Sequence, residues 1–144
     1  MKALIVYFSY SGNTEEVAEH IASRLKQDGW VVHLHHIGYG LSIDPSGYHL
    51  TFIGTFTWDY GEVPDEVEAF IAETGTQLEN VAVFGTGDTQ FGPEMQYCKA
   101  VDELVSVYQS KWPGLKIEQS PRGMQEKLID EWLEGVLDHV KNVT

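Results

Sequence analysis

The sequence has few of the residues that build disulfide-rich, metal-thiolate or nucleic-acid-binding proteins. Its 144 residues include a single cysteine, Cys98, which excludes an internal disulfide framework and a site with several thiolate ligands. Lysine and arginine number 9 against 22 aspartate and glutamate residues, for a formal net charge of −13. Such a surface repels nucleic acids and anionic lipids and attracts basic proteins. The alternative interpretation is that the acidity only keeps the protein soluble.

A long hydrophobic run is also missing. No segment reaches the roughly 20 apolar residues that span a bilayer. The apolar run over residues 2–8 is short, and the small-residue pattern of a cleaved signal peptide does not follow it. Together with the lone cysteine, which suits a reducing compartment, these absences predict a cytoplasmic protein. Hydrophobic residues still make up 42% of the chain, so we expect one domain with its own core over residues 1–144.

Short apolar runs alternate with stretches of helical periodicity along the chain. Strands are predicted over residues 2–8, 30–37, 48–56, 81–86 and 115–119. Helices are predicted over residues 14–28, 64–73, 94–109 and 122–141. Strands that alternate with helices form a parallel sheet covered on both faces. The predicted fold is a doubly wound α/β domain with a five-stranded parallel sheet in the order 2-1-3-4-5, which binds ligands beyond the carboxyl ends of its strands.

The loop after the first strand combines hydroxyl groups, one glycine and the start of a helix. Its residues are Ser9, Tyr10, Ser11, Gly12, Asn13 and Thr14. The free N–H groups of a helix N-terminus attract anions, and the hydroxyls add hydrogen-bond donors. Because the loop contains no lysine or arginine, it lacks the pattern of a nucleoside triphosphate site and favours a single phosphate held by neutral donors. The alternative is an ordinary helix cap.

The loops after the third and fourth strands combine aromatic residues with glycines. One contains Thr55, Phe56, Thr57, Trp58, Asp59, Tyr60 and Gly61, and the other contains Gly85, Thr86, Gly87, Asp88 and Phe91. A tryptophan between aromatic neighbours at a ligand-binding edge suits stacking on a flat π system. Glycines allow the backbone to approach a ligand closely. The alternative for Trp58 is a hydrophobic cover over the helix that follows.

These three loops, in this order, closely resemble the phosphate and flavin loops of the flavodoxin family. The similarity extends over essentially the whole chain and is greatest to the short-chain bacterial members. One departure is Asp59-Tyr60-Gly61, where many relatives have Gly-Asp-Gly. The resemblance implies a flavodoxin-like fold with FMN as cofactor. It also implies that Trp58 stacks on the inner face of the flavin and that Phe91 takes the place of the outer ring.

The resemblance further implies a low-potential one-electron carrier without catalytic residues. Such a carrier acts as a monomer and passes electrons from a flavodoxin reductase to acceptor redox proteins, and the acidic surface suits basic partners of this kind. Asp65, Glu66 and Glu68 complement the dipole at a helix start and are candidates for an acidic docking rim. The alternative is a flavodoxin-like activator of manganese ribonucleotide reductase, whose second flavin loop usually differs from residues 85–91.

Several chemically versatile side chains are predicted to have structural roles. Cys98 has no neighbouring histidine or base motif, which favours a buried packing residue over a nucleophile. His33, His35 and His36 lack the spacing of a closed metal site, so no metal is predicted. Three tryptophans are predicted to pack in the core or at the ends of elements: Trp30, Trp112 and Trp132.

Overall fold

The computed structural model describes residues 1–9, 12–38, 43–56, 63–78, 80–87, 98–118 and 123–143, with side chains up to residue 140. Five strands form one parallel sheet: β1 (Lys2–Tyr7), β2 (Val31–His36), β3 (Leu50–Phe56), β4 (Val81–Gly87) and β5 (Leu115–Glu118). Their order is β2-β1-β3-β4-β5, which confirms the predicted topology. As predicted, β3 is the central strand and β2 lies at an edge.

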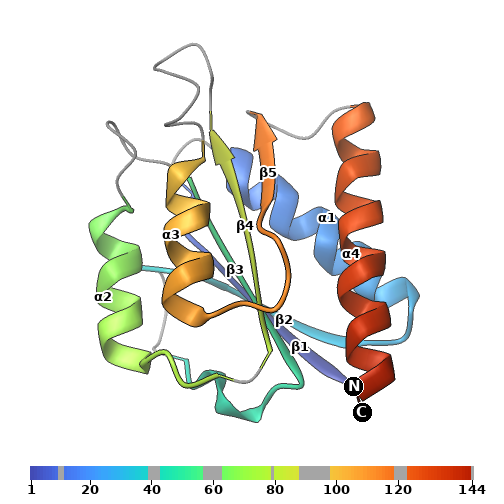
Figure 1. Cartoon of the computed structure of the whole chain (residues 1–144), viewed down its shortest axis with the longest axis horizontal. Helices are drawn as coiled ribbons and strands as arrows, with labels where there is room; N and C mark the ends of the chain where they lie inside the picture. Colours follow the sequence, from blue (N-terminus) through green and yellow to red (C-terminus); the bar gives the residue numbers. More distant parts are fainter. Residues whose placement is uncertain are drawn as a thin grey trace.

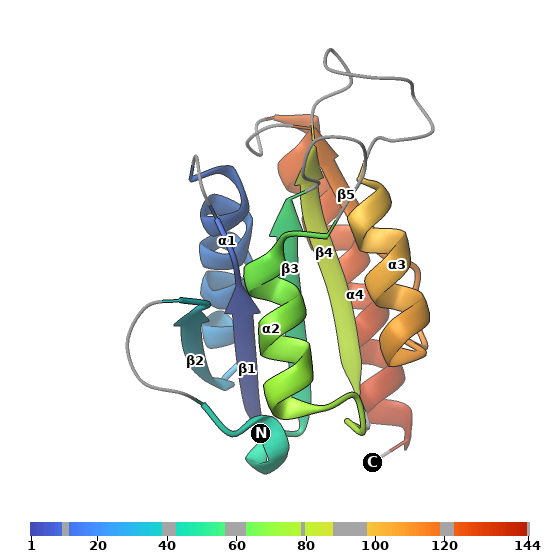
Figure 2. The ribbon, with the colours of Figure 1, turned by 90° about the vertical axis from the view of Figure 1, so that its left-hand side faces the viewer.

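Four α-helices cover the two faces of this sheet. They are α1 (Asn13–Gln27), α2 (Asp65–Thr74), α3 (Lys99–Tyr108) and α4 (Met124–Val143), with the 3-10 turn η1 (Pro45–Gly47) before β3. Figures 1 and 2 show α1 and α4 on one face and α2 and α3 on the other. None of the helices in the described residues is long and apolar enough to cross a bilayer.

Alternate residues of β1 contribute to the two hydrophobic cores. Ala3 and Ile5 pack with α1 and α4, whereas Leu4 and Val6 pack with α2 and α3. All four side chains are completely buried. Successive side chains of a strand point to opposite faces, so a strand covered on both faces must be apolar throughout. The sandwiched sheet explains why the first strand is an uninterrupted apolar run in the sequence.

The start of α3 differs from the prediction. The sequence predicted a helix from Glu94, but α3 begins at Lys99 because Cys98 has a φ of 52°, which interrupts a right-handed helix. Residues 94–97 lie outside the described residues. Periodicity could not reveal the break, since a cysteine does not favour a positive φ. The other element bounds agree with the prediction to within two residues.

The predicted packing residues are placed as follows. Cys98 is completely buried, which confirms its interpretation as a packing residue, and Trp30 and Trp112 are buried as well. Trp132 is half-buried against the core, and its indole N–H donates to the carbonyl oxygen of Pro113 at 2.8 Å. In the described part of the chain, no three histidine, cysteine or acidic side chains are grouped as metal ligands.

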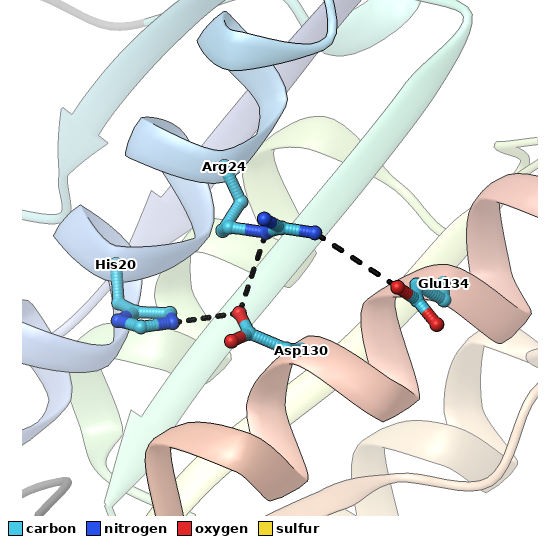
Figure 3. Close-up of polar contacts among 4 residues, drawn as sticks. All are labelled: His20, Arg24, Asp130 and Glu134. Carbon is cyan, nitrogen blue, oxygen red and sulfur yellow. Dashed lines mark hydrogen bonds and ion pairs between the residues drawn. The ribbon is translucent and has the colours of Figure 1, made fainter.

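An ion-pair network joins α1 to α4 (Figure 3). Asp130 Oδ1 lies 2.9 Å from His20 Nε2 and 3.4 Å from Arg24 Nε. The other end of the Arg24 guanidinium lies 4.0 Å from Glu134 Oε1. These side chains are partly exposed, and surface ion pairs of this kind contribute about 1 kcal/mol or less each. The network therefore links the two helices but adds little to the stability of the fold.

Candidate functional site

The carboxyl ends of β1, β3 and β4 meet at one edge of the sheet (Figure 2). In the strand register Tyr7 pairs with Gly54, and Phe56 pairs with Thr86. The N–H of Phe8 donates to the carbonyl oxygen of Gly54 at 3.0 Å, which extends the pairing past the end of β1. The three loops identified in the sequence therefore begin side by side.

Gly12 shapes the backbone at the start of α1. It has a φ of 96° and a ψ of −9°, a left-handed conformation that glycine adopts with little strain. Its N–H donates to Ser9 Oγ at 3.1 Å, and its carbonyl oxygen accepts from the N–H of Glu16 at 3.0 Å. A Cβ at this position would meet no atom of the described residues within 4 Å, apart from its chain neighbours.

Neutral hydrogen-bond donors gather at this N-terminus. The N–H groups of Asn13, Thr14 and Glu15 precede the first intrahelical hydrogen bond and have no acceptor inside the helix. Ser9 Oγ accepts from Gly12, which leaves its own proton available to a further acceptor. A phosphate group offers oxygen acceptors and negative charge, so this donor set fits it without a basic side chain.

Two of the predicted loops are joined directly by a hydrogen bond between hydroxyls. Thr14 Oγ1 lies 2.9 Å from Thr86 Oγ1, and the two residues are separated by 72 positions in the sequence. Their exposed fractions are 1% and 3%, so the bond is shielded from water. The first turn of α1 is thereby connected to the carboxyl end of β4.

The described residues of the third and fourth strand ends are held by packing. Thr55 is completely buried, and its Oγ1 donates to the carbonyl oxygen of Phe56 at 2.9 Å. The Phe56 ring stacks on Phe8, with 5.5 Å between ring centroids. A Cβ on Gly85 would lie 2.6 Å from the carbonyl oxygen of Thr55 and would also collide with Val101. The packing of α3 on the sheet therefore requires a glycine at position 85, independently of any ligand.

The predicted site residues divide into two groups. Nine lie at this edge of the sheet: Ser9, Gly12, Asn13, Thr14, Thr55, Phe56, Gly85, Thr86 and Gly87. The other nine lie outside the described residues: Tyr10, Ser11, Thr57, Trp58, Asp59, Tyr60, Gly61, Asp88 and Phe91. Their roles toward a ligand stay predictions.

His36 belongs to this edge, although the sequence did not indicate it. Its Nε2 lies 3.3 Å from the backbone nitrogen and 3.2 Å from the carbonyl oxygen of Ser9, and its ring stacks on Tyr7 with 4.8 Å between centroids. Its Nδ1 lies 3.9 Å from Glu15 Oε2. The pairing of β2 with β1 places His36 opposite Tyr7. Only this register, which periodicity does not determine, could have pointed to His36.

Two titratable side chains close to His36, Tyr7 and His35, have shifted pKa values. Burial raises the pKa of the Tyr7 phenol, and the carboxylates of Glu15 and Glu19 raise it further. Burial lowers the pKa of His35, and the neighbouring His36 lowers it further, against a smaller opposing effect of Glu73. Both pKa shifts favour the neutral forms of these side chains.

A 2-1-3-4-5 parallel sheet with neutral hydrogen-bond donors at the β1/β3 switch point defines a flavodoxin-like α/β fold. The sequence profile described as Flavodoxin matches residues 5–132. The chain is 32% identical to the probable flavodoxin 2 of Bacillus subtilis, over 88% of this chain and 87% of that protein. It is 30% identical to the flavodoxin of Maridesulfovibrio salexigens, with 96% and 99% covered. The crystal structure of oxidised flavodoxin 1 from Bacillus cereus superposes with a TM-score of 0.82 at 28% identity, covering 96% and 99% of the two chains.

The chain belongs to the flavodoxin family. Members of this family are electron-transfer flavoproteins with FMN as their cofactor. FMN is accordingly the cofactor of this chain, and the donor set at the N-terminus of α1 fits its phosphate group. The family expected from the sequence is confirmed, and so is the expected cofactor.

Proposed function

We propose that this protein is a low-potential one-electron carrier that moves electrons between a basic reductase and acceptor redox proteins. The observation that carries the proposal is the set of neutral hydrogen-bond donors at the N-terminus of α1, which lies at the carboxyl edge of the sheet. The protein acts as a monomeric electron-transfer protein and not as an enzyme. Its cytoplasmic location stays a prediction from the single cysteine.

The proposed cofactor contacts divide between the phosphate and the ring. The phosphate accepts hydrogen bonds from Ser9, Ser11, Asn13 and Thr14 of the first loop, while Gly12 gives the backbone its left-handed turn and donates to Ser9 Oγ. Trp58 stacks on the inner face of the ring and Phe91 covers the outer face. When bound, FMN supplies the one-electron redox chemistry, and the protein sets its electrostatic environment.

The acidity of the chain supports both the low potential and the choice of partner. Each added electron brings negative charge, which a protein of net charge −13 disfavours. Asp65, Glu66 and Glu68 are exposed in the first turn of α2. That turn follows the carboxyl end of β3, so the carboxylates lie on the side of the molecule where the proposed site lies (Figure 2).

The first test is the identity and amount of bound cofactor. We expect one FMN per chain in the purified protein, because the phosphate site is neutral and the sequence has no adenosine-binding fingerprint. Heat release followed by mass spectrometry identifies the flavin, and absorbance gives its ratio to protein. FAD in place of FMN would show that the site was misinterpreted. Superoxide release as the main product of reoxidation would favour the ribonucleotide reductase activator over the carrier.

The second test is the salt dependence of reduction by a basic reductase. We expect the association rate to fall as ionic strength rises, because steering acts within a Debye length of about 10 Å at 0.1 M salt. Stopped-flow mixing measures this rate. Neutralising Asp65, Glu66 and Glu68 together should slow association at low salt and flatten the salt dependence.

The matched control neutralises three exposed carboxylates elsewhere, Asp28, Glu131 and Asp138. It changes the net charge equally but acts at the end of α1 and on α4, which cover the other face of the sheet from α2. Its effect on the association rate should be smaller. If the two triple variants slowed association equally, the α2 carboxylates would act only through the net charge of the protein and not as a docking surface.

A further inference from the structure

The hydrogen bond between the buried hydroxyls of Thr14 and Thr86 can run in either direction, and a bound phosphate would select one of the two. Among the described residues, Thr14 Oγ1 is the hydrogen-bond partner of Thr86 Oγ1, at 2.9 Å, and either hydroxyl can be the donor. Each hydroxyl has one proton and two acceptor lone pairs. Either Thr14 donates to Thr86, or Thr86 donates to Thr14.

Phosphate oxygens are acceptors, so a hydroxyl that binds them must donate its proton. If Thr14 donates to phosphate, it cannot also donate to Thr86. Thr86 must then be the donor of the buried pair, and Thr14 Oγ1 accepts one hydrogen bond while it donates another. A hydroxyl that accepts a hydrogen bond becomes a stronger donor, and the accepted bond also restricts its rotation.

We propose that Thr86 is a positioning residue for phosphate binding, which donates to Thr14 Oγ1 and so directs the Thr14 proton toward the phosphate of FMN. This inference rests on the proposed phosphate contact of Thr14. It assigns Thr86 a different role from the direct cofactor contact predicted from the sequence. Thr86 belongs to β4, whose backbone is paired on both sides, and this makes it a rigid support for a side chain of α1.

The test compares FMN with riboflavin, which has the same ring system but no phosphate. Thr86→Val removes the hydroxyl and keeps the shape of the side chain. The variant should bind FMN about fivefold more weakly, the factor that corresponds to one hydrogen bond, while riboflavin binding stays unchanged. The full chain, freed of flavin, is titrated with each ligand by flavin fluorescence. The ³¹P resonance of bound FMN should also move in the variant.

Four further variants complete the design. Thr86→Ser keeps a donor at this position and should restore the FMN to riboflavin affinity ratio. Thr51→Val removes a different buried threonine hydroxyl, at the amino end of β3, and should leave the ratio unchanged. With Thr14 already changed to valine, Thr86→Val should have little further effect on FMN binding, because the two hydroxyls act through one another.

The possible outcomes separate this inference from the proposed function. An equal loss of FMN and riboflavin affinity in Thr86→Val would mean that Thr86 contacts the ring. Unchanged affinities for both ligands would mean that Thr86 does not position Thr14. Either outcome would overturn the inference. Failure of the unmodified chain to prefer FMN over riboflavin would instead overturn the proposed phosphate site. If Thr86→Val does not fold, Thr86→Ala, which also removes the hydroxyl, supplies the ratio and the ³¹P shift.

Discussion

Replacing Gly85 with alanine is expected to lower the free energy of unfolding by about 3 kcal/mol, at the upper end of the usual cost of overpacking. The added Cβ would lie 2.6 Å from the carbonyl oxygen of Thr55 and would collide with a methyl group of Val101. A side chain can rotate away, but the carbonyl belongs to a backbone paired in the middle of the sheet. The clash with this carbonyl can therefore be relieved only by parting β3 from β4.

Urea denaturation of the flavin-free protein measures this loss without the contribution of ligand binding. Gly135→Ala is the matched control, because Gly135 is exposed on α4 and a Cβ there would meet nothing within 4 Å. That variant should be stabilised by about 0.5–1 kcal/mol, since alanine favours a helix over glycine. If Gly85→Ala were as stable as the unmodified protein, the Thr55 carbonyl of β3 would not lie as close to Gly85 as described.

Replacing Trp58 with alanine is expected to weaken FMN binding by roughly 1–3 kcal/mol, a factor of about 5 to 150 in the dissociation constant. The loss combines the stacking of two aromatic systems with the exposure of apolar surface of the flavin. Fluorescence titration of the flavin-free chain measures it. Trp58→Phe retains an aromatic face and should recover part of the affinity.

The same variants test the alternative that Trp58 covers the helix that follows. In that case Trp58→Ala would lower the free energy of unfolding of the flavin-free protein and leave the dissociation constant for FMN unchanged. Under the stacking interpretation the order of effects is reversed, with a large loss of affinity and a small loss of stability. Both measurements on one preparation therefore decide between the two interpretations.

Much of the fold could be predicted because hydrophobic patterns within short segments of the sequence determine its strands and helices. The continuous apolar run of β1 indicates a strand buried on both faces, and the helical spacing of Val17, Ile21 and Leu25 indicates the buried side of α1. The regular alternation of the two kinds of element then leaves few topologies open. The start of α3 could not be predicted in this way, because the positive φ of Cys98 depends on its surroundings and not on its own preference.

The candidate site also has features that the sequence predicts and features that depend on the tertiary structure. The sequence alone determined the family, the neutral composition of the phosphate loop and the acidity of the surface, because each of these depends on which residues occur and in what order. Only the tertiary structure decided that Thr86 bonds to Thr14, that His36 lies against Ser9, and that Gly85 is required by Thr55 and Val101. Each of these contacts joins different elements of the fold. Their distances are set by strand register and helix packing, which composition and periodicity do not record.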